Sequence, residues 1–290
     1  MKTAALLMPL LSLALLAGCS KTEEPTKPKV ASESAAPAGY LEKIKARDKL
    51  IVGVFTDKPP FGFVDESGRY VGFDTDIGRR FAKDLLGDEN KVEFVAVEPA
   101  SRIPFLQSDK VDLILANMTV TPERKEAVEF TNPNLKVAVQ ALVPQGSSVK
   151  KLDDLATRTT IVTTGTTADI WLTKTHPDWK LLKFEKNSES LQALANGRGD
   201  AYAQDNLVLF SWAKQNPGYR VLEEKLGAEA PIAPAVKKGN TELRDWVNSE
   251  LAKLGEEKYL LKLYDQYVRK ELSDDTRPES VIVEGGKWQG

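Results

Sequence analysis

The sequence predicts an α/β protein made of two α/β lobes that are joined by two hinge strands. Short apolar strands alternate with amphipathic helices along the chain, which is typical of α/β layers. The alternation occurs in two successive blocks, and two extended apolar segments, residues 137–143 and 232–236, connect them. Because ligands of open α/β sheets bind beyond the carboxyl ends of the strands, we expect the functional residues in the strand-to-helix loops.

The composition is that of a globular protein and excludes several classes of function. The chain has 290 residues, of which 41% are hydrophobic and 28% are charged. A net charge of −2 gives no electrostatic basis for binding nucleic acid or acidic membranes. One cysteine and one histidine cannot form an internal disulfide or a Cys/His zinc site. The sequence also lacks a P-loop and a dinucleotide fingerprint, so we expect no metal and no cofactor.

The first block of alternating elements begins with a short apolar segment that we expect to be a buried strand. Residues 75–86 carry apolar side chains at helical spacing. Thr121 and Pro122 supply a helix N-cap and a proline at the first helical position. The expected strands are residues 50–55, 92–97 and 111–115, and the expected helices are residues 75–86, one after Ser101 and one from Thr121.

The second block repeats this pattern after the first crossing segment. Two amphipathic helices in residues 243–268 then close the body. We therefore divide the chain into lobe 1 (residues 41–140 and 234–272), lobe 2 (141–233) and a C-terminal tail (273–290). The expected strands of the second block are residues 159–163, 181–184 and 201–203, and its expected helices begin at Thr167, Ser188 and Asn206.

Residues 1–18 are expected to be a signal peptide. Residues 4–16 are almost entirely apolar but are shorter than the roughly 20 apolar residues that span a bilayer. The next residues, Leu16-Ala17-Gly18-Cys19, resemble the lipobox of bacterial lipoproteins, which implies cleavage before Cys19 and lipidation of that cysteine. A plain secretory signal with an incidental cysteine is the alternative. Residues 19–40 are rich in Lys, Glu, Ser, Ala and Pro, and we expect a flexible tether.

Arg124 is the first candidate for ligand binding, because it is expected in the first turn of a helix. The helix dipole disfavours a cation at that position. A guanidinium there could instead bind a carboxylate as a planar fork. A surface arginine paired with Glu123 is the alternative, and position alone does not decide between the two.

Residues 163–167 form the second candidate, a threonine-rich loop between a strand and a helix. Gly165 permits close approach of the backbone, and the free amides at the start of the helix favour an anion. The hydroxyls of Thr164, Thr166 and Thr167 add donors. Simple N-capping by a threonine is the alternative. Because this loop belongs to lobe 2, it could meet the same carboxylate as the first candidate when the cleft closes.

Asp205 is the third candidate, since it follows a strand and precedes a helix. Its carboxylate could accept hydrogen bonds from an ammonium group, or it could merely cap the helix. Phe55 follows the first strand and could form a pocket wall, with a core or turn role as the alternative. Arg102 lies in the first turn of another helix, which is again a poor place for a cation without a partner.

Together these loops predict a binding site for a zwitterion. Arg124 and residues 163–167 would supply a cation and helix-start amides. Asp205 would supply an anion. A ligand with a carboxylate at one end and an ammonium at the other needs this arrangement. The pattern therefore predicts a free α-amino acid.

Several segments resemble the polar amino-acid family of bacterial extracellular solute-binding proteins (family 3), and the match covers nearly all of residues 45–270. The resemblance implies the periplasmic-binding-protein type II fold. It also implies that two lobes close around the ligand and deliver it to an ABC permease. The matching segments are residues 50–63 (LIVGVFTDKPPFGF), 72–76 (GFDTD), 110–124 (KVDLILANMTVTPER), 165–167 (GTT) and 197–201 (GRGDA), the last followed by 204–205 (QD).

The resemblance also implies roles for individual residues. Arg124 would hold the α-carboxylate, and Asp205 would hold the α-ammonium with a carbonyl near Asn117. The threonines that would help Arg124 are Thr119, Thr166 and Thr167, and the residues at pocket-lining positions of the family are Phe55, Lys58, Arg102 and Met118.

Some stretches look like the cysteine-binding lipoproteins of this family, which implies cysteine as the ligand. They are residues 116–121, 186–189, 197–200, 232–238 and 281–286. Cystine is the next alternative, followed by glutamate or aspartate. Asn134 follows Pro133 where the family usually has an aromatic residue. The expected partners are a free amino acid, an ABC permease and, through the lipid anchor, a membrane. We expect a monomer in the cell envelope that faces the periplasm or the exterior.

Two other classes of function remain alternatives on the same fold. A cyclohexadienyl dehydratase shares these segments, so a dehydratase-type enzyme is one. Such an enzyme would need an additional acid in the pocket, and the loops described above contain none. His176, the only histidine, follows a helix and is expected to be a cap or surface group. A sensor of the cell envelope is the second alternative. We expect that the protein is not an enzyme.

Overall fold

The computed structural model of the protein describes residues 39–273 and 276–288. The predicted signal peptide, the predicted lipidation site Cys19 and the predicted tether up to residue 38 lie outside the described residues. Helix α1 (Tyr40–Arg47) begins at the last residue of the predicted tether. Tyr40 therefore belongs to the folded body.

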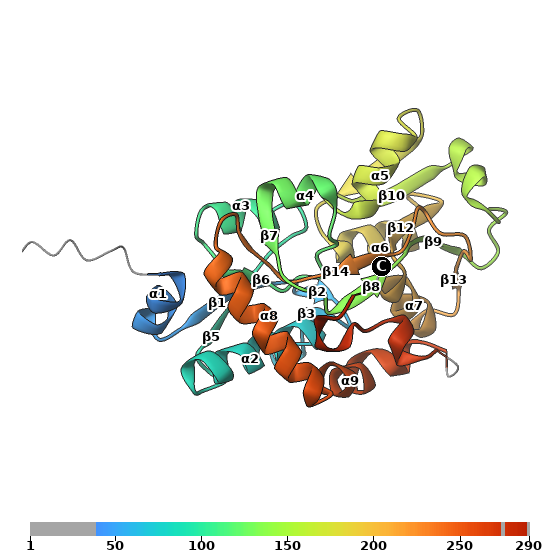
Figure 1. Cartoon of the computed structure of the whole chain (residues 1–290). Helices are drawn as coiled ribbons and strands as arrows, with labels where there is room; N and C mark the ends of the chain where they lie inside the picture. The colour runs from blue at the N-terminus through green and yellow to red at the C-terminus, as the bar shows by residue number, and fades with distance from the viewer. Residues whose placement is uncertain (1–38, 274–275, 289–290) are drawn as a thin grey trace, which may run out of the picture. The chain divides into compact units, whose positions relative to one another are not determined.

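The first lobe contains a five-stranded sheet with the order β5-β1-β6-β15-β7 (Figure 1). Strands β5, β1 and β6 are parallel, and β15 is antiparallel to both of its neighbours. The strands are β1 (Leu50–Val54), β5 (Val92–Ala96), β6 (Leu113–Ile114), β7 (Val128–Phe130) and β15 (Ala235–Lys237), and the further helices are α2 (Phe73–Leu86), α3 (Arg102–Gln107), α4 (Pro122–Ala127), α8 (Thr241–Glu256) and α9 (Tyr259–Leu263).

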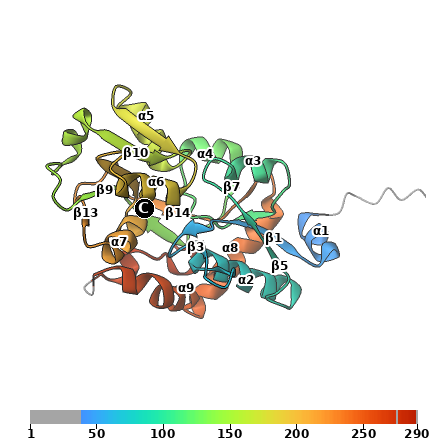
Figure 2. The same ribbon diagram turned by 180° about the vertical axis from the view of Figure 1, so that it is seen from behind.

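The second lobe contains another five-stranded sheet, with the order β11-β10-β12-β9-β13. Figures 1 and 2 show the two sheets, with their helices, as two separate groups. The prediction of an α/β protein with two lobes is confirmed, and the residue boundaries of the lobes stay a prediction. The strands are β9 (Val139–Pro144), β10 (Thr159–Thr163), β11 (Lys180–Phe184), β12 (Ala201–Asp205) and β13 (Tyr219–Val221), and the helices are α5 (Thr167–Thr175), α6 (Asn187–Ala195) and α7 (Asn206–Gln215).

Two chain segments cross between the lobes, and they pair with each other. β8 (Leu135–Val137) and β14 (Ala230–Ile232) form an antiparallel ribbon. The two long crossing strands expected from the sequence are each divided in two, because the pairing is interrupted at Ala138 and at Ala233 and Pro234. Proline has no N–H to continue a ladder, and the carbonyl of Pro234 accepts the Thr131 N–H at 3.0 Å. Each crossing therefore has a break beside the sheet that it enters.

A small three-stranded sheet, which the sequence did not predict, follows β1. Its strands are β2 (Asp57–Lys58), β3 (Gly62–Val64) and β4 (Tyr70–Val71). Strands of two or three residues are too short for a periodic pattern. Gly72 has a φ of 124°, and a Cβ there would lie 2.3 Å from the Phe61 carbonyl oxygen. This glycine lets the small sheet pack closely at the start of α2.

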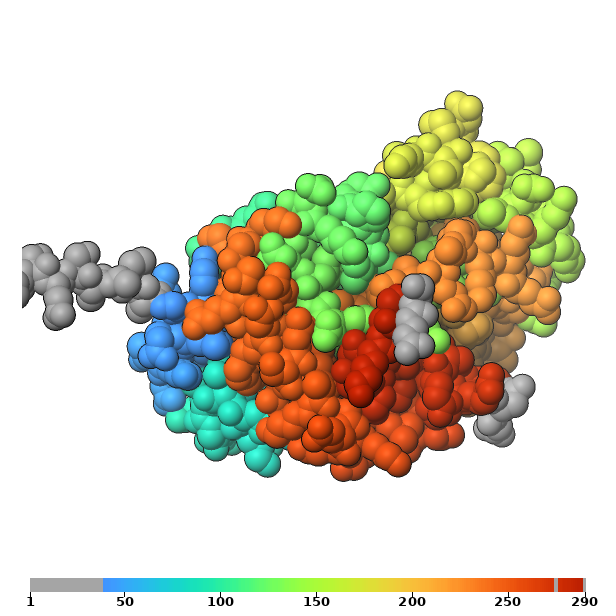
Figure 3. All heavy atoms as spheres, in the orientation of Figure 1, coloured from blue at the N-terminus to red at the C-terminus, as the bar shows by residue number. Residues whose placement is uncertain are grey.

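The end of the chain packs on the crossing strand β8. Ile282 forms a bridge with Leu135, and the Lys136 N–H donates to the Val281 carbonyl at 2.8 Å. The side chains of Val281, Ile282 and Val283 are buried. Figure 3 shows this segment in red beside the orange helix α8. The described part of the predicted tail is therefore part of the folded body.

The largest apolar cluster packs α2, α8 and α9 against the first sheet. Smaller clusters fill the second lobe. The second closing helix changes after α9 to a π-helical turn over Tyr264–Val268. In the described part of the chain, no helix combines the length and the apolar character that crossing a membrane requires.

Candidate functional site

Loops from both lobes surround a cavity of about 10 Å³, which we call the inner cavity. A volume of this size holds about one water molecule. Nine of the twelve predicted ligand-binding residues line it. They are Phe55, Lys58, Arg102, Asn117, Thr119 and Arg124 from the first lobe and Thr166, Thr167 and Asp205 from the second lobe.

Lys58 of β2 extends across the inner cavity to Asp205 at the end of β12. Its Nζ lies 3.2 Å from Oδ2 of Asp205 and donates to Oδ1 of Asn117 at 2.8 Å. Both charged side chains are buried, with 2% and 5% of their surfaces exposed. Burial lowers the pKa of Lys58, and the neighbouring Asp205 opposes that shift. Among the described residues, Asp205 makes no side-chain capping bond to α7, so the alternative of a simple helix cap is wrong.

Arg124 lies in the first turn of α4 and is 4% exposed, which excludes the alternative of a surface arginine. Its Nη1 donates to the Thr119 carbonyl at 2.8 Å and to Oγ1 of Thr167 at 3.4 Å. Its Nη2 donates to the Gly165 carbonyl at 3.0 Å. Burial lowers the pKa of Arg124 to about 10, so the guanidinium keeps its charge at neutral pH. This side chain therefore connects both lobes.

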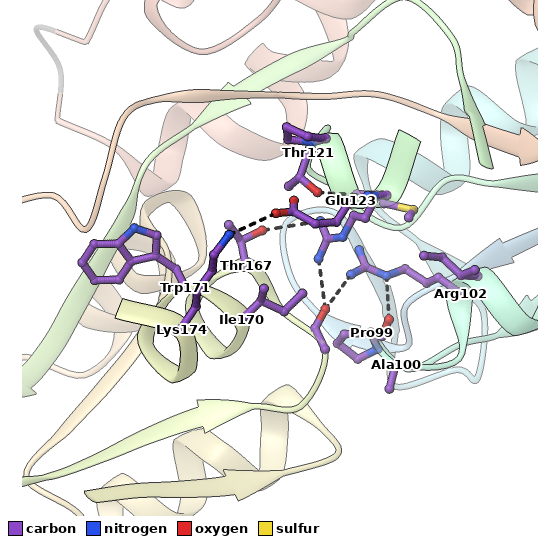
Figure 4. Close-up of a pocket in the computed structure, with 14 residues that line it drawn as sticks. Pro99, Ala100, Arg102, Thr121, Glu123, Thr167, Ile170, Trp171 and Lys174 are labelled. Carbon is purple, nitrogen blue, oxygen red and sulfur yellow. Dashed lines mark hydrogen bonds and ion pairs between the residues drawn. The ribbon is translucent and has the colours of Figure 1, made fainter. Parts of the chain in front are cut away.

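Arg102 opens helix α3 and is also buried (Figure 4). Its Nε donates to the Pro99 carbonyl at 3.0 Å, and its Nη1 donates to the Ala116 carbonyl at 3.0 Å. Its Nη2 lies 3.4 Å from the Gly165 carbonyl, which also accepts from Arg124. Burial lowers the pKa of Arg102, and the nearby guanidinium of Arg124 lowers it further.

The threonine-rich loop contributes both a helix cap and a contact across the cleft. Oγ1 of Thr166 accepts the Asp169 N–H at 3.3 Å, so the N-capping alternative is correct for this threonine. Oγ1 of Thr167 donates to Oγ1 of Thr119 in the other lobe at 3.0 Å. The loop therefore has two structural roles, and its role in binding an anion stays a prediction.

Asn117 connects the charged groups of the first lobe. Its backbone is left-handed, with a φ of 43°, and its N–H donates to Oδ2 of Asp74 at 3.0 Å. Its carbonyl accepts from Nη1 of Arg102 at 3.3 Å, and its Oδ1 accepts from Lys58. Its Nδ2 is buried and has no hydrogen-bond partner among the described residues. Burial raises the pKa of Asp74 to about 6.

Figure 4 shows the lining of a larger cavity of about 470 Å³, which we call the outer cavity. Arg102 and Arg124 line both cavities. Two predicted ligand-binding residues, Met118 and Gly165, line the outer cavity. Thr164 lines neither cavity in the described part of the chain, because its N–H continues the pairing with strand β11 at 2.8 Å.

The wall of the outer cavity is largely apolar and has an ion pair on it. Ile103 of the first lobe and Ile170 and Trp171 of the second lobe contribute to the lining. Nζ of Lys174 lies 3.6 Å from Oε1 of Glu123, and both side chains are exposed (Figure 4). This pair joins α5 to α4 across the cleft.

Sequence reasoning missed three residues of this region. Pro99 and Gln204 line the inner cavity, and Asp74 lies behind it as the acceptor for Asn117. Gln204 and Asp74 both occur in the segments that carry the family resemblance, which is the signal that could have identified them. Oε1 of Gln204 accepts the backbone N–H of Asp205 at 3.0 Å and so orients that residue.

The sequence profile of bacterial extracellular solute-binding proteins, family 3, matches residues 50–270 of the chain. The glutamine-binding protein of Geobacillus stearothermophilus is 40% identical over 228 residues, which are 77% of this chain and 87% of that protein. The L-cystine-binding protein TcyJ of Escherichia coli K12 is 27% identical over 263 residues, which are 90% of this chain and 94% of that protein.

Solved structures extend the likeness to the three-dimensional fold. The cysteine-binding protein from Campylobacter jejuni is 44% identical with a TM-score of 0.84, and the match covers 85% of this chain and 100% of that one. A solute receptor for L-cysteine of Neisseria gonorrhoeae is 45% identical with a TM-score of 0.82, covering 84% and 99%. The ancestral amino acid-binding protein AncCDT-1, a precursor of cyclohexadienyl dehydratase, is 34% identical with a TM-score of 0.72, covering 80% and 100%.

Proposed function

The chain belongs to family 3 of the bacterial extracellular solute-binding proteins, and from this premise we propose that it is the L-cysteine receptor of an ABC importer. The predicted family and the predicted type II fold are confirmed. The chain is an extracytoplasmic amino-acid-binding protein that serves an ABC transporter. Cysteine, the lipid anchor and the roles of individual residues are the proposed part.

The observation that carries this proposal is the meeting of opposite charges from the two lobes in one small cavity. Arg124, with its threonine neighbours, supplies a buried cation for an α-carboxylate. Asp205 supplies a buried anion for an α-ammonium, and only one of its oxygens bonds to Lys58. Buried ions need a partner of opposite charge, and a free amino acid offers both.

Ligand entry requires the two lobes to separate. The inner cavity of about 10 Å³ is smaller than any amino acid. The only crossings in the described residues are the β8 and β14 segments, each with a break beside a sheet. Bending at these breaks would open the cleft and would close it again around the ligand. The closed form would then present both lobes together to the permease.

The two solved cysteine-binding structures, at 44% and 45% identity, favour cysteine over other amino acids. Glutamine is the competing ligand, because the relative from Geobacillus stearothermophilus is 40% identical. Cystine and glutamate or aspartate remain alternatives from the sequence. The cations that line the inner cavity disfavour a neutral amide as the side chain of the ligand.

The proposal also covers how the protein is attached to a membrane. We propose that Cys19 carries the lipid anchor and that a flexible tether holds a monomeric receptor at a membrane of the cell envelope. Mass spectrometry of the mature protein tests this, because a lipidated product would begin at Cys19. A Cys19→Ala variant that stays membrane-bound would contradict it.

The ligand is tested by what the purified protein holds and binds. Extraction of the natively purified protein, followed by mass spectrometry, should release cysteine. Calorimetry of refolded, ligand-free protein under reducing conditions should give tight binding of cysteine, weaker binding of cystine and no binding of arginine. Tight binding of glutamine alone would overturn the cysteine assignment but not the transport class. Turnover of prephenate would favour a dehydratase instead.

A further inference from the structure

Arg102 is a buried cation without an acidic partner. All four of its hydrogen bonds go to backbone carbonyls, those of Pro99, Ala116, Asn117 and Gly165. In residues 39–273 and 276–288, no carboxylate lies within ion-pair distance of this guanidinium. Buried charges are normally paired, so this side chain is suited to an anion supplied by a ligand.

The charges of the side chains that line the inner cavity do not balance. The lining contains three cations, Lys58, Arg102 and Arg124, and one carboxylate, Asp205. Asp74 and Asp57 lie behind the lining, where Asp74 accepts the Asn117 N–H and Asp57 accepts the Ser188 N–H. A zwitterionic ligand adds one positive and one negative charge and leaves the excess of two cations in the lining unchanged.

A second observation indicates an acceptor at the same place. Asn117 lines the inner cavity, is 3% exposed, and has a buried Nδ2 with no hydrogen-bond partner among the described residues. Its Oδ1 is already bonded to Lys58, so the free group is a donor. A buried donor without an acceptor is costly, and an anionic ligand atom would satisfy it.

We propose that Arg102, with Lys58 and the Asn117 amide beside it, forms a second anion subsite that binds the ionised side chain of the ligand. Cysteine, which rests on the function proposed above, then binds as the thiolate. The S–H bond breaks, the sulfur keeps the electron pair, and the proton passes to the solvent. The ligand thus carries a net charge of −1 and offsets one of the two excess cations of the lining.

The chemistry of the thiol fits this subsite. A free thiol has a pKa of about 8.5, so most cysteine in neutral solution is protonated. Neighbouring cations shift a thiol towards the thiolate. The titratable and charged groups that face Arg102 and Lys58 are Arg124, Asp205, Asp74 and Asp57. Any proton that these groups exchange on ligand binding must be separated from the proton of the thiol.

Calorimetry in buffers of different ionisation enthalpy makes this separation. Cysteine and serine are titrated at pH 7 into the full-length, ligand-free protein, in phosphate and in Tris under reducing conditions. Serine differs by one atom and keeps its hydroxyl proton, so its titration reports only the protein groups. We expect cysteine to release about one more proton per site than serine. Equal proton release for the two ligands would overturn the proposal.

The role of Arg102 is tested with two variants and a matched control. Arg102→Met should lower the affinity for cysteine on the order of 100-fold and abolish the additional proton release. Arg102→Lys keeps the positive charge and should retain the additional proton release. Arg102 lies over the ring of Phe55 at 5.6 Å. Arg198→Met is the control, because Arg198 lies over the ring of Phe184 at 4.9 Å but is exposed. The control should behave as the wild type.

A measurement on the unmodified protein keeps the test valid if a variant fails to fold. Bound cysteine should show the ultraviolet absorption of a thiolate at pH 6, where free cysteine does not. Binding of cysteine without this band and without proton release overturns the subsite and leaves the proposed function intact. Tight binding of glutamine with no binding of cysteine overturns both.

Discussion

Lys58 and Asp205 form a buried ion pair between the two lobes, with Nζ 3.2 Å from Oδ2. The lysine belongs to β2 of the first lobe and the aspartate ends β12 of the second. This carboxylate therefore connects the two lobes and also lines the inner cavity. Removal of one partner from a buried pair leaves the other charge without compensation.

Asp205→Asn should therefore weaken ligand binding strongly. The amide cannot pair with Lys58 or with an α-ammonium as a charge, and breaking a buried pair costs about 3–5 kcal/mol. We expect the affinity measured by calorimetry to fall on the order of 100-fold or more. Asp178→Asn, at an exposed position of the same lobe, is the control and should bind normally. Near wild-type affinity of Asp205→Asn would refute the role of this carboxylate.

Arg124→Ala should abolish binding of every α-amino acid. The buried guanidinium is the proposed partner of the α-carboxylate, which this change leaves without a charged donor, at a cost of about 3–5 kcal/mol. Arg124→Lys keeps the charge but loses the planar fork, so we expect it to bind with intermediate affinity. Titration of the ligand panel measures both variants, and the circular dichroism spectrum checks their folding. Wild-type affinity of Arg124→Ala would refute the assignment of Arg124 to the α-carboxylate.

Gly165→Ala should hinder closure of the lobes. Gly165 has a φ of 78°, and a Cβ there would lie 2.8 Å from Cα of Ala100 in the first lobe. Backbone atoms cannot move aside as a flexible side chain can, and overpacking of this kind costs about 1–3 kcal/mol. We expect ligand affinity to fall by about 10- to 100-fold.

Gly197→Ala is the matched control for this change. Gly197 lies in the same lobe with a φ of 68°, but a Cβ there meets no atom within 4 Å. Both variants should lower the melting temperature, because alanine is strained at positive φ. Only Gly165→Ala should lower the affinity. Equal affinities for the two variants would show that the contact with Ala100 does not limit closure.

The sequence predicted the parts of the fold that rest on local patterns. The helices α2 and α8 have apolar faces at helical spacing, and Thr121 and Pro122 begin α4 as expected. The strand-to-helix loops could be located in the same way, which is why most of the candidate residues line one cavity. The family resemblance added Lys58, which no local pattern singles out.

The features of the site that the sequence did not predict depend on contacts between distant parts of the chain. Met118 lies between Asn117 and Thr119, which line the inner cavity, but Met118 itself lines the outer cavity. The left-handed backbone at Asn117 breaks the regular alternation of side chains, so no periodic pattern predicts this arrangement. Asp74 in the first turn of α2 looks like an ordinary acid at a helix N-terminus. Its burial arises only when the loop at Asn117 packs over it.

Asp74 should make the stability of the ligand-free protein depend on pH. Burial raises its pKa to about 6, whereas the carboxyl of an unfolded chain titrates near 3.9. Between about pH 4 and pH 6 the folded protein holds a proton that the unfolded chain has lost, so the free energy of unfolding falls as the pH rises through this range. Above pH 6 the contribution is constant. The difference in pKa corresponds to about 3 kcal/mol.

Asp74→Asn should remove this step. The amide oxygen can still accept the Asn117 N–H, which Asp74 accepts at 3.0 Å, and the side chain has no charge to bury. Urea unfolding between pH 4 and pH 7.5 measures the effect, and Asp178→Asn is again the exposed control. We expect the free energy of unfolding of the variant to exceed that of the wild type by an amount that grows between about pH 4 and pH 6. Above pH 6 the difference should stay constant at about 3 kcal/mol. Parallel profiles for variant and wild type would mean that Asp74 is ionised throughout this range, and that Lys58 and Arg102 compensate its charge fully.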